Sequence, residues 1–432
     1  MTTVVTAETF RDMLDERRRG DRSFVVVDTR PAESYEGWRI ADSRHHFYKP
    51  FHEFDLEAFE HETGVTDADH VVTLCAKGKA SSAFAEELEA AGYDDVVIVE
   101  DGMRAWSAVY DHATVPLPDA GDDPLDVVQI QRRAKGCLGY LIVGGSTNDA
   151  TEVYESAADA DRVAVAVDVS RHGEEWIEAA ERYDAAIIGA LDTHVHADHL
   201  SGGRALADEL AVPYYLPAAA AERDVAYDFE PLDRNATLDV GGVDVKALAT
   251  PGHTADMASY LVGRSAVLTG DTLFADGIGR TELQFATAED DADAEPGDES
   301  DAAERVGAET GARDLYDSLH ATLLAEPDDI VVCPGHFPVA NDGTTGDVVP
   351  GEPVATTVGA ARTELDVLGL DRDAFVDRIT ATLPEKPPNY ADVIAANRGV
   401  EAPPDEVSAI ELELGPNRCA AEPAAEPPAD DD

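Results

Sequence analysis

The chain has 432 residues, of which 89 are Asp or Glu and 32 are Lys or Arg, and its formal net charge at pH 7 is −57. This length is enough for two or three domains with a large core. The carboxylates are spread through every part of the chain, which argues against a single acidic tail, and their number disfavours binding to nucleic acid or anionic membranes.

Residues 1–116 alternate short apolar runs with helical patterns, which is typical of a small parallel α/β domain. The strands are predicted at 23–28, 71–74 and 96–99, and a helix at 81–91. Residues 117–124, rich in Pro and Asp, are predicted to be a linker.

Residues 125–355 form a second predicted domain, in which short apolar strands are each followed by polar residues. Within it, residues 286–311 have almost no apolar side chain larger than Ala, so we expect a mobile acidic insertion on the surface. Residues 356–400 are predicted to be a helical extension. Residues 401–432, rich in Ala, Pro, Glu and Asp, are predicted to be a partly disordered tail.

A first candidate site is the cysteine loop, which joins a strand end to a helix start. In such a loop, backbone N–H groups and the positive end of the helix stabilise a thiolate or a bound persulfide anion. An isolated cysteine is otherwise most often a buried structural residue. Cys75 opens the loop, which continues through Ala76, Lys77, Gly78, Lys79, Ala80 and Ser81.

A second candidate site begins with His194, His196, Asp198 and His199, all within six residues directly after the apolar run 185–191. His253, Asp271 and His336 follow three further strand-like runs. Imidazole and carboxylate are the ligands that borderline divalent metals prefer, so this pattern predicts a metal centre where the strand ends meet.

The order HxHxDH, His, Asp, His resembles the metallo-β-lactamase superfamily over residues 125–345. The stretches 27–30, 33–37 and 100–106, together with the Cys75 loop, resemble a rhodanese domain. These resemblances imply an N-terminal rhodanese-like α/β domain, then an αββα sandwich (α+β) with its metal between two sheets, and a short helical C-terminal extension.

Five further stretches resemble the persulfide (sulfur) dioxygenase branch of the superfamily: 131–141, 167–172, 279–284, 383–390 and 395–399. That resemblance implies one Fe(II) per chain, bound by His194, His253 and Asp271. It makes His196, Asp198, His199 and His336 neighbours that orient ligands and substrate, and it lets Arg280 meet an anionic substrate. We count Cys75, Asp198 and Arg280 as candidate catalytic residues.

The expected reaction oxidises a thiol persulfide with O2 to the thiol and sulfite. Cys75 would feed the persulfide or combine sulfane sulfur with sulfite to make thiosulfate. Glutathione-using members of this branch have other residues at two places in the chain. Here Phe337 and Pro338 follow the last histidine, and Glu364 follows the pair Arg362-Thr363. We therefore expect another low-molecular-weight thiol, or a protein persulfide, as the substrate.

Two other functions stay open. The first is a thioester hydrolase of the glyoxalase II type with two Zn(II) ions, in which Asp271 bridges and His196, Asp198, His199 and His336 are ligands. The second is a non-catalytic sulfur carrier or sensor. The sequence leaves open both the direction of sulfur flow and whether the protein is a monomer or a homo-oligomer.

The sequence shows no signal peptide and no run long enough to span a membrane, and its four cysteines lie far apart. This favours a reducing cytoplasm. The acidic composition is similar to that of haloarchaeal cytoplasmic proteins, which predicts a folded state that needs molar salt. Cys137 and Cys333 are predicted to be packing residues.

Overall fold

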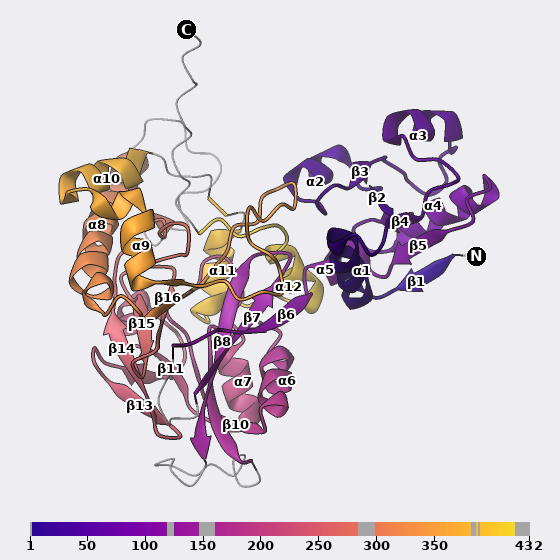
Figure 1. Ribbon diagram of the computed structural model, residues 1–432. Helices are drawn as coiled ribbons and strands as arrows, with labels where there is room; N and C mark the ends of the chain where they lie inside the picture. The colour runs from indigo at the N-terminus through magenta and orange to yellow at the C-terminus, as the bar shows by residue number, and fades with distance from the viewer. Residues whose placement is uncertain are drawn as a thin grey trace.

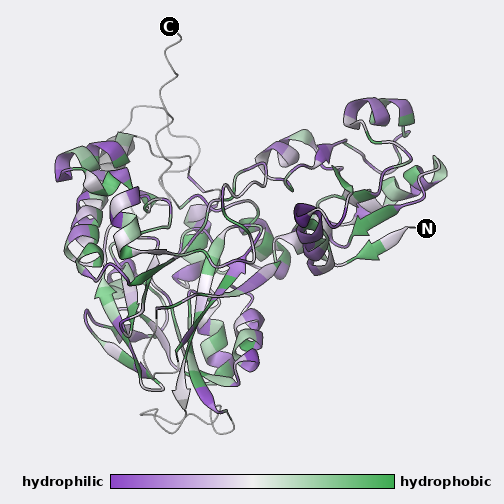
Figure 2. Ribbon diagram, viewed as in Figure 1, coloured by the Kyte–Doolittle hydropathy of each residue, from purple (hydrophilic) through white to green (hydrophobic). Residues whose placement is uncertain are grey.

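The computed structural model describes residues 2–118, 125–146, 160–283, 299–381, 386–387 and 389–419. An N-terminal domain lies beside a larger domain built on two sheets (Figure 1). The hydrophobic residues gather on the strands of both (Figure 2). No helix in these ranges is both long enough and apolar enough to cross a membrane.

The N-terminal domain is a parallel sheet in the order β1-β5-β4-β2-β3, with helices on both faces. Its strands are β1 (Thr3–Val5), β2 (Val25–Asp28), β3 (Arg44–His45), β4 (Val71–Leu74) and β5 (Val96–Val99). Its helices are α1 (Ala7–Arg19), α2 (Ala32–Gly37), α3 (Leu56–Thr63), α4 (Lys79–Ala90) and α5 (Gly102–Trp106). The strands are valine-rich because α1 and α5 bury one face and α3 and α4 the other.

The second domain stacks a sheet in the order β12-β11-β10-β9-β8-β7-β6 on one in the order β13-β14-β15-β16-β17-β18. The first contains β6 (Tyr110–Thr114), β7 (Asp126–Arg132), β8 (Cys137–Ser146), β9 (Arg162–Val167), β10 (Ala185–Leu191), β11 (Tyr214–Pro217) and β12 (Glu230–Leu232). The second contains β13 (Thr237–Val240), β14 (Val243–Ala249), β15 (Ala258–Val262), β16 (Ala266–Gly270), β17 (Val331–Pro334) and β18 (Thr356–Thr357). The inner faces of both sheets form one apolar core.

Helices cover the outer faces of this pair of sheets. The first sheet packs against α6 (Glu174–Arg182) and α7 (Gly203–Leu210), and the second against α8 (Glu299–Ala321), α9 (Val358–Glu364) and α10 (Arg372–Ala381). Two C-terminal helices, α11 (Tyr390–Asn397) and α12 (Glu406–Leu412), follow. The predicted αββα sandwich after an α/β domain is confirmed, although α9 and α10 are part of the sandwich and not an appendage.

Two predicted boundaries are wrong. Residues 110–116 do not belong to the first domain, because β6 pairs antiparallel with β7 and so extends the first sheet of the sandwich. Residues 299–311 of the expected insertion are the first half of α8, in which Ala308 is fully buried. The rest of that insertion through residue 298, and residues 119–124 of the expected linker, lie outside the described residues.

The expected tail is folded into the protein as far as residue 419. Residues 406–412 are helical, and Glu413 and Cys419 are buried at 1% and 0% exposure. Glu413 accepts hydrogen bonds from Arg132 at 3.0 and 3.2 Å and from Arg171 at 2.6 Å. These pairs offset the cost of burying a carboxylate. Residues 420–432, for which we expected disorder, lie outside the described residues.

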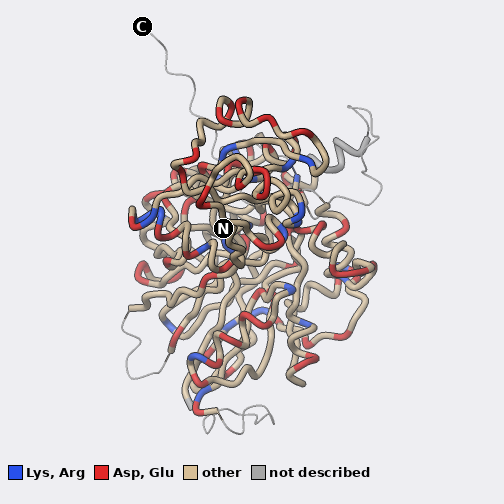
Figure 3. The backbone as a smooth tube through the Cα atoms, turned by 90° about the vertical axis from the view of Figure 1, so that its right-hand side faces the viewer, with Lys and Arg blue, Asp and Glu red and all other residues tan. Residues whose placement is uncertain are grey.

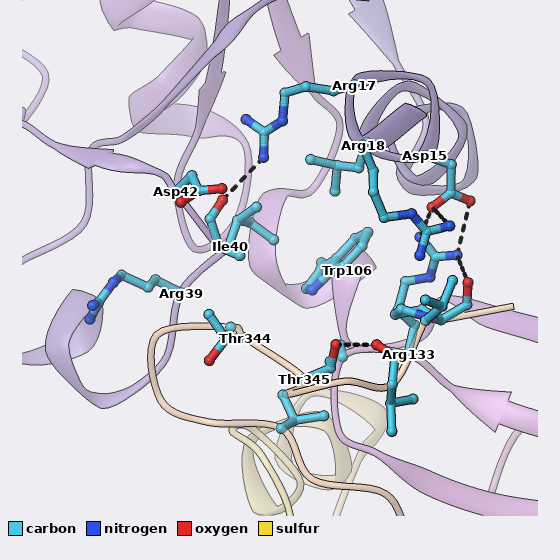
Figure 4. Close-up of a pocket in the computed structure, with 18 of the residues that line it drawn as sticks. Asp15, Arg17, Arg18, Arg39, Ile40, Asp42, Trp106, Arg133, Thr344 and Thr345 are labelled. Carbon is cyan, nitrogen blue, oxygen red and sulfur yellow. Dashed lines mark hydrogen bonds and ion pairs between the residues drawn. The ribbon is translucent and has the colours of Figure 1, made fainter. Parts of the chain in front are cut away.

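The two domains contact each other around a cavity of about 720 Å³, which is lined by α1, residues 38–44 and residues 343–350 (Figure 4). At its edge Arg133 bonds to Asp15 of α1 at 2.9 Å and to Asp111 of β6 at 2.6 Å. The same arginine therefore links the two domains.

Candidate functional site

The metal motif lies where strands of both sheets end. His194, His253 and Asp271 follow β10, β14 and β16, and their ligand atoms lie within 4.8 Å of one another. All three side chains are at most 1% exposed. His194 Nε2, His253 Nε2 and Asp271 Oδ2 have no hydrogen-bond partner within the described part of the chain. Buried polar atoms are rarely left unpaired, so this donor set fits a bound metal ion.

Neighbouring groups orient these donors. His253 Nδ1 lies 2.7 Å from the carbonyl oxygen of Arg280, so this nitrogen donates and Nε2 keeps its lone pair for the centre. His194 Nδ1 lies 3.0 Å from Thr193 Oγ1. Burial alone would raise the pKa of Asp271, but the charge of His336 beside it holds this pKa well below its usual range. Asp271 is therefore a carboxylate.

His196 is close to His194, but its ring faces other partners. His196 Nε2 lies 3.2 Å from Asp168 Oδ1, and these two residues group with Asp192. Asp168 also accepts from the backbone N–H of Thr193 at 2.7 Å. Burial lowers the pKa of His196, yet the carboxylate of Asp168 raises it above its ordinary value overall. His196 thus differs from His194 and His253 in the carboxylates that it faces, although its Nε2, like theirs, has no hydrogen-bond partner among the described residues.

A second cluster lies next to Asp271, and its members pair with one another. His199 Nδ1 lies 3.1 Å from Asp198 Oδ1, and His336 Nε2 lies 3.1 Å from Asp271 Oδ1. Despite burial, the charges of His199 and His336 lower the pKa of Asp198 well below its usual value. This cluster is held by internal ion pairs.

Two cysteines also belong to this second cluster, and the sequence analysis did not predict a role for either of them there. Cys137 donates to Asp198 Oδ2 at 3.1 Å, and Cys419 groups with Asp198 and His336 within 4.8 Å. Cys137 stands in a stretch that resembles the dioxygenase branch, so that stretch was a usable signal. Cys419 stands in a segment expected to be partly disordered, and its composition gave no signal. Cys333 is buried in β17 as expected.

Arg280 does not face an open substrate site. Its guanidinium forms a fully buried ion pair with Glu282, and it donates to the carbonyl oxygen of Arg418 at 2.9 Å. The backbone N–H of Arg280 donates to the carbonyl oxygen of Cys419 at 3.0 Å. The expected contact with an anionic substrate is therefore corrected: Arg280 positions His253 and the C-terminal segment.

Residues outside the first contacts hold the motif loop in place. Asn397 of α11 donates to the carbonyl oxygens of His196 and His199 at 2.9 and 2.8 Å. Glu413 accepts from the backbone N–H of Leu200 at 2.8 Å. The C-terminal helices thus brace the metal motif. Arg362, which the sequence comparison with glutathione-using members singled out, does not contact the motif loop: it bonds to Asp328 on the surface.

The cysteine loop has the geometry predicted for it. Cys75 follows β4 and is 5% exposed, Gly78 has φ +77°, and α4 begins at Lys79, so the last three residues of the predicted loop form its first turn. Ser81 Oγ lies 3.4 Å from Cys75 Sγ. A Cβ on Gly102 would lie 1.8 Å from the carbonyl oxygen of Cys75, so only glycine allows this close approach.

Comparisons with known proteins agree with both halves of the fold. Residues 6–109 match the Rhodanese-like domain family, and residues 167–336 match the Metallo-beta-lactamase superfamily. A hydroxyacylglutathione hydrolase of Acidiphilium cryptum is 40% identical over 104 residues, which is 24% of this chain and 42% of that protein. An uncharacterized protein of Mycobacterium leprae, ML0493, is 32% identical over 170 residues, which is 34% of this chain and 67% of that protein.

A solved structure of a metallo-β-lactamase from Staphylococcus aureus aligns with a TM-score of 0.49 and 22% identity, covering 64% of this chain and 73% of that one. The chain spans less than half of the Acidiphilium hydrolase that it matches. The chain therefore contains a rhodanese-like domain at its N-terminus, followed by a metallo-β-lactamase domain.

Proposed function

We propose that this protein is a persulfide dioxygenase with an attached sulfurtransferase domain. In the balanced reaction a thiol persulfide, O2 and water give the thiol, sulfite and two protons. The observation that carries the proposal is the separation of donors. The ligand atoms of His194, His253 and Asp271 lie within 4.8 Å of one another, whereas His196 groups with Asp168 and Asp192.

Two imidazoles and one carboxylate are the donor set of non-haem Fe(II) oxygenases, and such an ion leaves positions for O2 and substrate and supplies one-electron chemistry. Around it, the chain excludes bulk water, because every side chain of the motif is at most 4% exposed. The carbonyl of Arg280 fixes the orientation of the His253 ring, and the hydroxyl of Thr193 fixes that of the His194 ring. Asp198, His199 and His336 would bind the persulfide end of the substrate and transfer its protons.

In the N-terminal domain, Cys75 would carry sulfane sulfur. The loop after β4 and the first turn of α4 offer backbone N–H groups to a persulfide anion. The four cysteines form no disulfide, which fits a reducing cytoplasm. The thiol that enters as persulfide, and the direction of transfer at Cys75, are to be found by assay.

A second function has its own support. The relatives at 40% identity are named hydroxyacylglutathione hydrolases, and Asp271 faces both His253 and His336, as a bridging carboxylate would. A thioester hydrolase with two zinc ions would use that bridge.

Metal analysis and two assays separate these functions. Protein reconstituted with Fe(II) or Zn(II) in molar KCl is given glutathione persulfide, with oxygen uptake as the readout, and S-lactoylglutathione, with thiol release as the readout. The proposal predicts one iron per chain and iron-dependent oxygen uptake. Two zinc ions per chain together with thioester hydrolysis would favour the hydrolase instead of the dioxygenase. If neither activity is found, the function that remains is a sulfur carrier or sensor.

A further inference from the structure

The segment from Glu411 to Cys419 lies between the two candidate sites. Glu411 of α12 pairs with Lys77 of the cysteine loop at 3.5 Å and with Arg104, next to that loop, at 3.0 Å. Figure 1 shows α12 next to α5 of the rhodanese-like domain. Eight residues further on, Cys419 reaches Asp198 and His336 of the second cluster, next to Asp271. One short segment therefore contacts both sites.

A cavity of about 350 Å³ separates the cysteine loop from this segment. Ala76 and Lys77 line it on the rhodanese side, and Gly415 and Arg418 line it on the other. Cys75 directly precedes Ala76 in the chain, and Cys419 directly follows Arg418. Each cysteine is thus the chain neighbour of a residue that lines the same cavity, although neither cysteine is itself among the lining residues.

Four basic residues line the cavity in a chain whose net charge is −57: Arg30, Lys77, Arg104 and Arg418. Arg30 pairs with Asp28, and Glu411 in the wall pairs with both Lys77 and Arg104, so the basic residues outnumber these two carboxylates by two. Such a cluster raises the local concentration of anions. A persulfide is a small anion of this kind.

Cys419 lies in the second cluster, beside the three metal donors. Its thiol is fully buried, and its carbonyl oxygen accepts from the backbone N–H of Arg280, which also orients His253 through its own carbonyl. His336 Nδ1, on a side chain 4% exposed, has no hydrogen-bond partner among the residues described. The metal centre is thus built with a protein thiol next to a buried, unpaired donor.

We propose that Cys419 is an internal persulfide carrier, which takes sulfane sulfur from Cys75 and presents it at the metal centre. The Cys419 thiol attacks the outer sulfur of the Cys75 persulfide. A new S–S bond forms, the Cys75 Sγ to outer-sulfur bond breaks, and its electron pair leaves with Cys75, which takes up the proton released by Cys419. No net oxidation occurs in this step. The oxidation of the Cys419 persulfide rests on the proposed function.

The test follows the sulfur and not the enzyme's activity. Full-length protein is treated under nitrogen with inorganic polysulfide, desalted, incubated, alkylated and digested, and the persulfide on each cysteine peptide is measured by mass spectrometry. We expect sulfur on Cys75 at once and on Cys419 later, and its loss from Cys419 in Cys75→Ser. Cys333→Ser, which removes another fully buried thiol, should leave this pattern unchanged.

No sulfur on Cys419 in the wild-type protein, equal sulfur on Cys419 in Cys75→Ser, or transfer to Cys137 instead would overturn the carrier. Oxygen uptake with glutathione persulfide is measured in parallel. Persulfide on Cys419 without oxygen uptake would reject the proposed dioxygenase activity and retain the carrier role of Cys419. Oxygen uptake without persulfide on Cys419 would reject the carrier role and retain the dioxygenase activity.

Discussion

Glu413 is the anchor of the C-terminal segment, and replacing it by Gln should cost about 3 kcal/mol. The carboxylate bonds to Arg132 twice, to Arg171 and to the N–H of Leu200. Burial raises the pKa of Glu413, but the charge of Arg132 outweighs burial and lowers this pKa from 4.5 to about 2. That lowering corresponds to about 3 kcal/mol at neutral pH. It agrees with the roughly 3–5 kcal/mol lost when one partner of a buried ion pair is removed.

The pH dependence has a definite sign. Because the pKa of Glu413 is lower in the folded protein than in the unfolded chain, its contribution is complete above about pH 5 and is lost as the pH falls toward 2. The difference between wild type and Glu413→Gln should therefore shrink to about 1.4 kcal/mol at pH 3. Urea denaturation in molar KCl, followed by circular dichroism, measures both values.

Glu406→Gln is the matched control. It removes a carboxylate that bonds to the same Arg171 but is 70% exposed, so it should cost less than about 0.5 kcal/mol. A Glu413→Gln cost as small as that of Glu406→Gln, or a cost that grows as the pH falls, would refute the reasoning.

Other outcomes follow from the site and the surface. His253→Ala and Asp271→Ala should each lose bound iron and oxygen uptake, whereas His196→Ala, whose ring faces Asp168, should keep iron at saturating Fe(II); equal metal loss in all three would contradict the ligand set. Cys75→Ser should abolish sulfur transfer and leave oxygen uptake with glutathione persulfide, because a hydroxyl cannot replace the thiolate; loss of both activities in a folded, metal-bound variant would rule out an independent transfer site. Acidic residues are spread along the whole described chain (Figure 3), so the melting temperature should rise across a KCl series, and a flat trend would exclude a halophilic adaptation.

The metal donors could be predicted because each follows a short apolar strand. β10 lies in one sheet and β14, β16 and β17 lie in the other, and the core between the sheets brings the ends of these strands together. A strand run followed by His or Asp therefore carries most of the three-dimensional information about His194, His253, Asp271 and His336.

The role of Arg280 could not be predicted in the same way. A basic residue near a metal motif favours an anionic substrate, but the charge is neutralised by Glu282, only two residues away. Whether those two side chains meet depends on backbone direction in a loop, which has no periodic pattern. Asp168 is a similar case, because its φ of +49° turns it toward Thr193 and His196.

The fold of the C-terminal segment depends on partners far away in the chain, which composition cannot show. Glu413 meets Arg132 across 281 residues. If this pair is the anchor, losing it should free Cys419 by local opening and not by global unfolding. In Glu413→Gln, alkylation of Cys419 by iodoacetamide should accelerate by up to about a hundredfold, the equivalent of about 3 kcal/mol. Cys333, equally buried but in β17, should accelerate far less. Equal acceleration of both thiols would mean that Glu413 stabilises the whole domain and that the segment holding Cys419 has no anchor of its own.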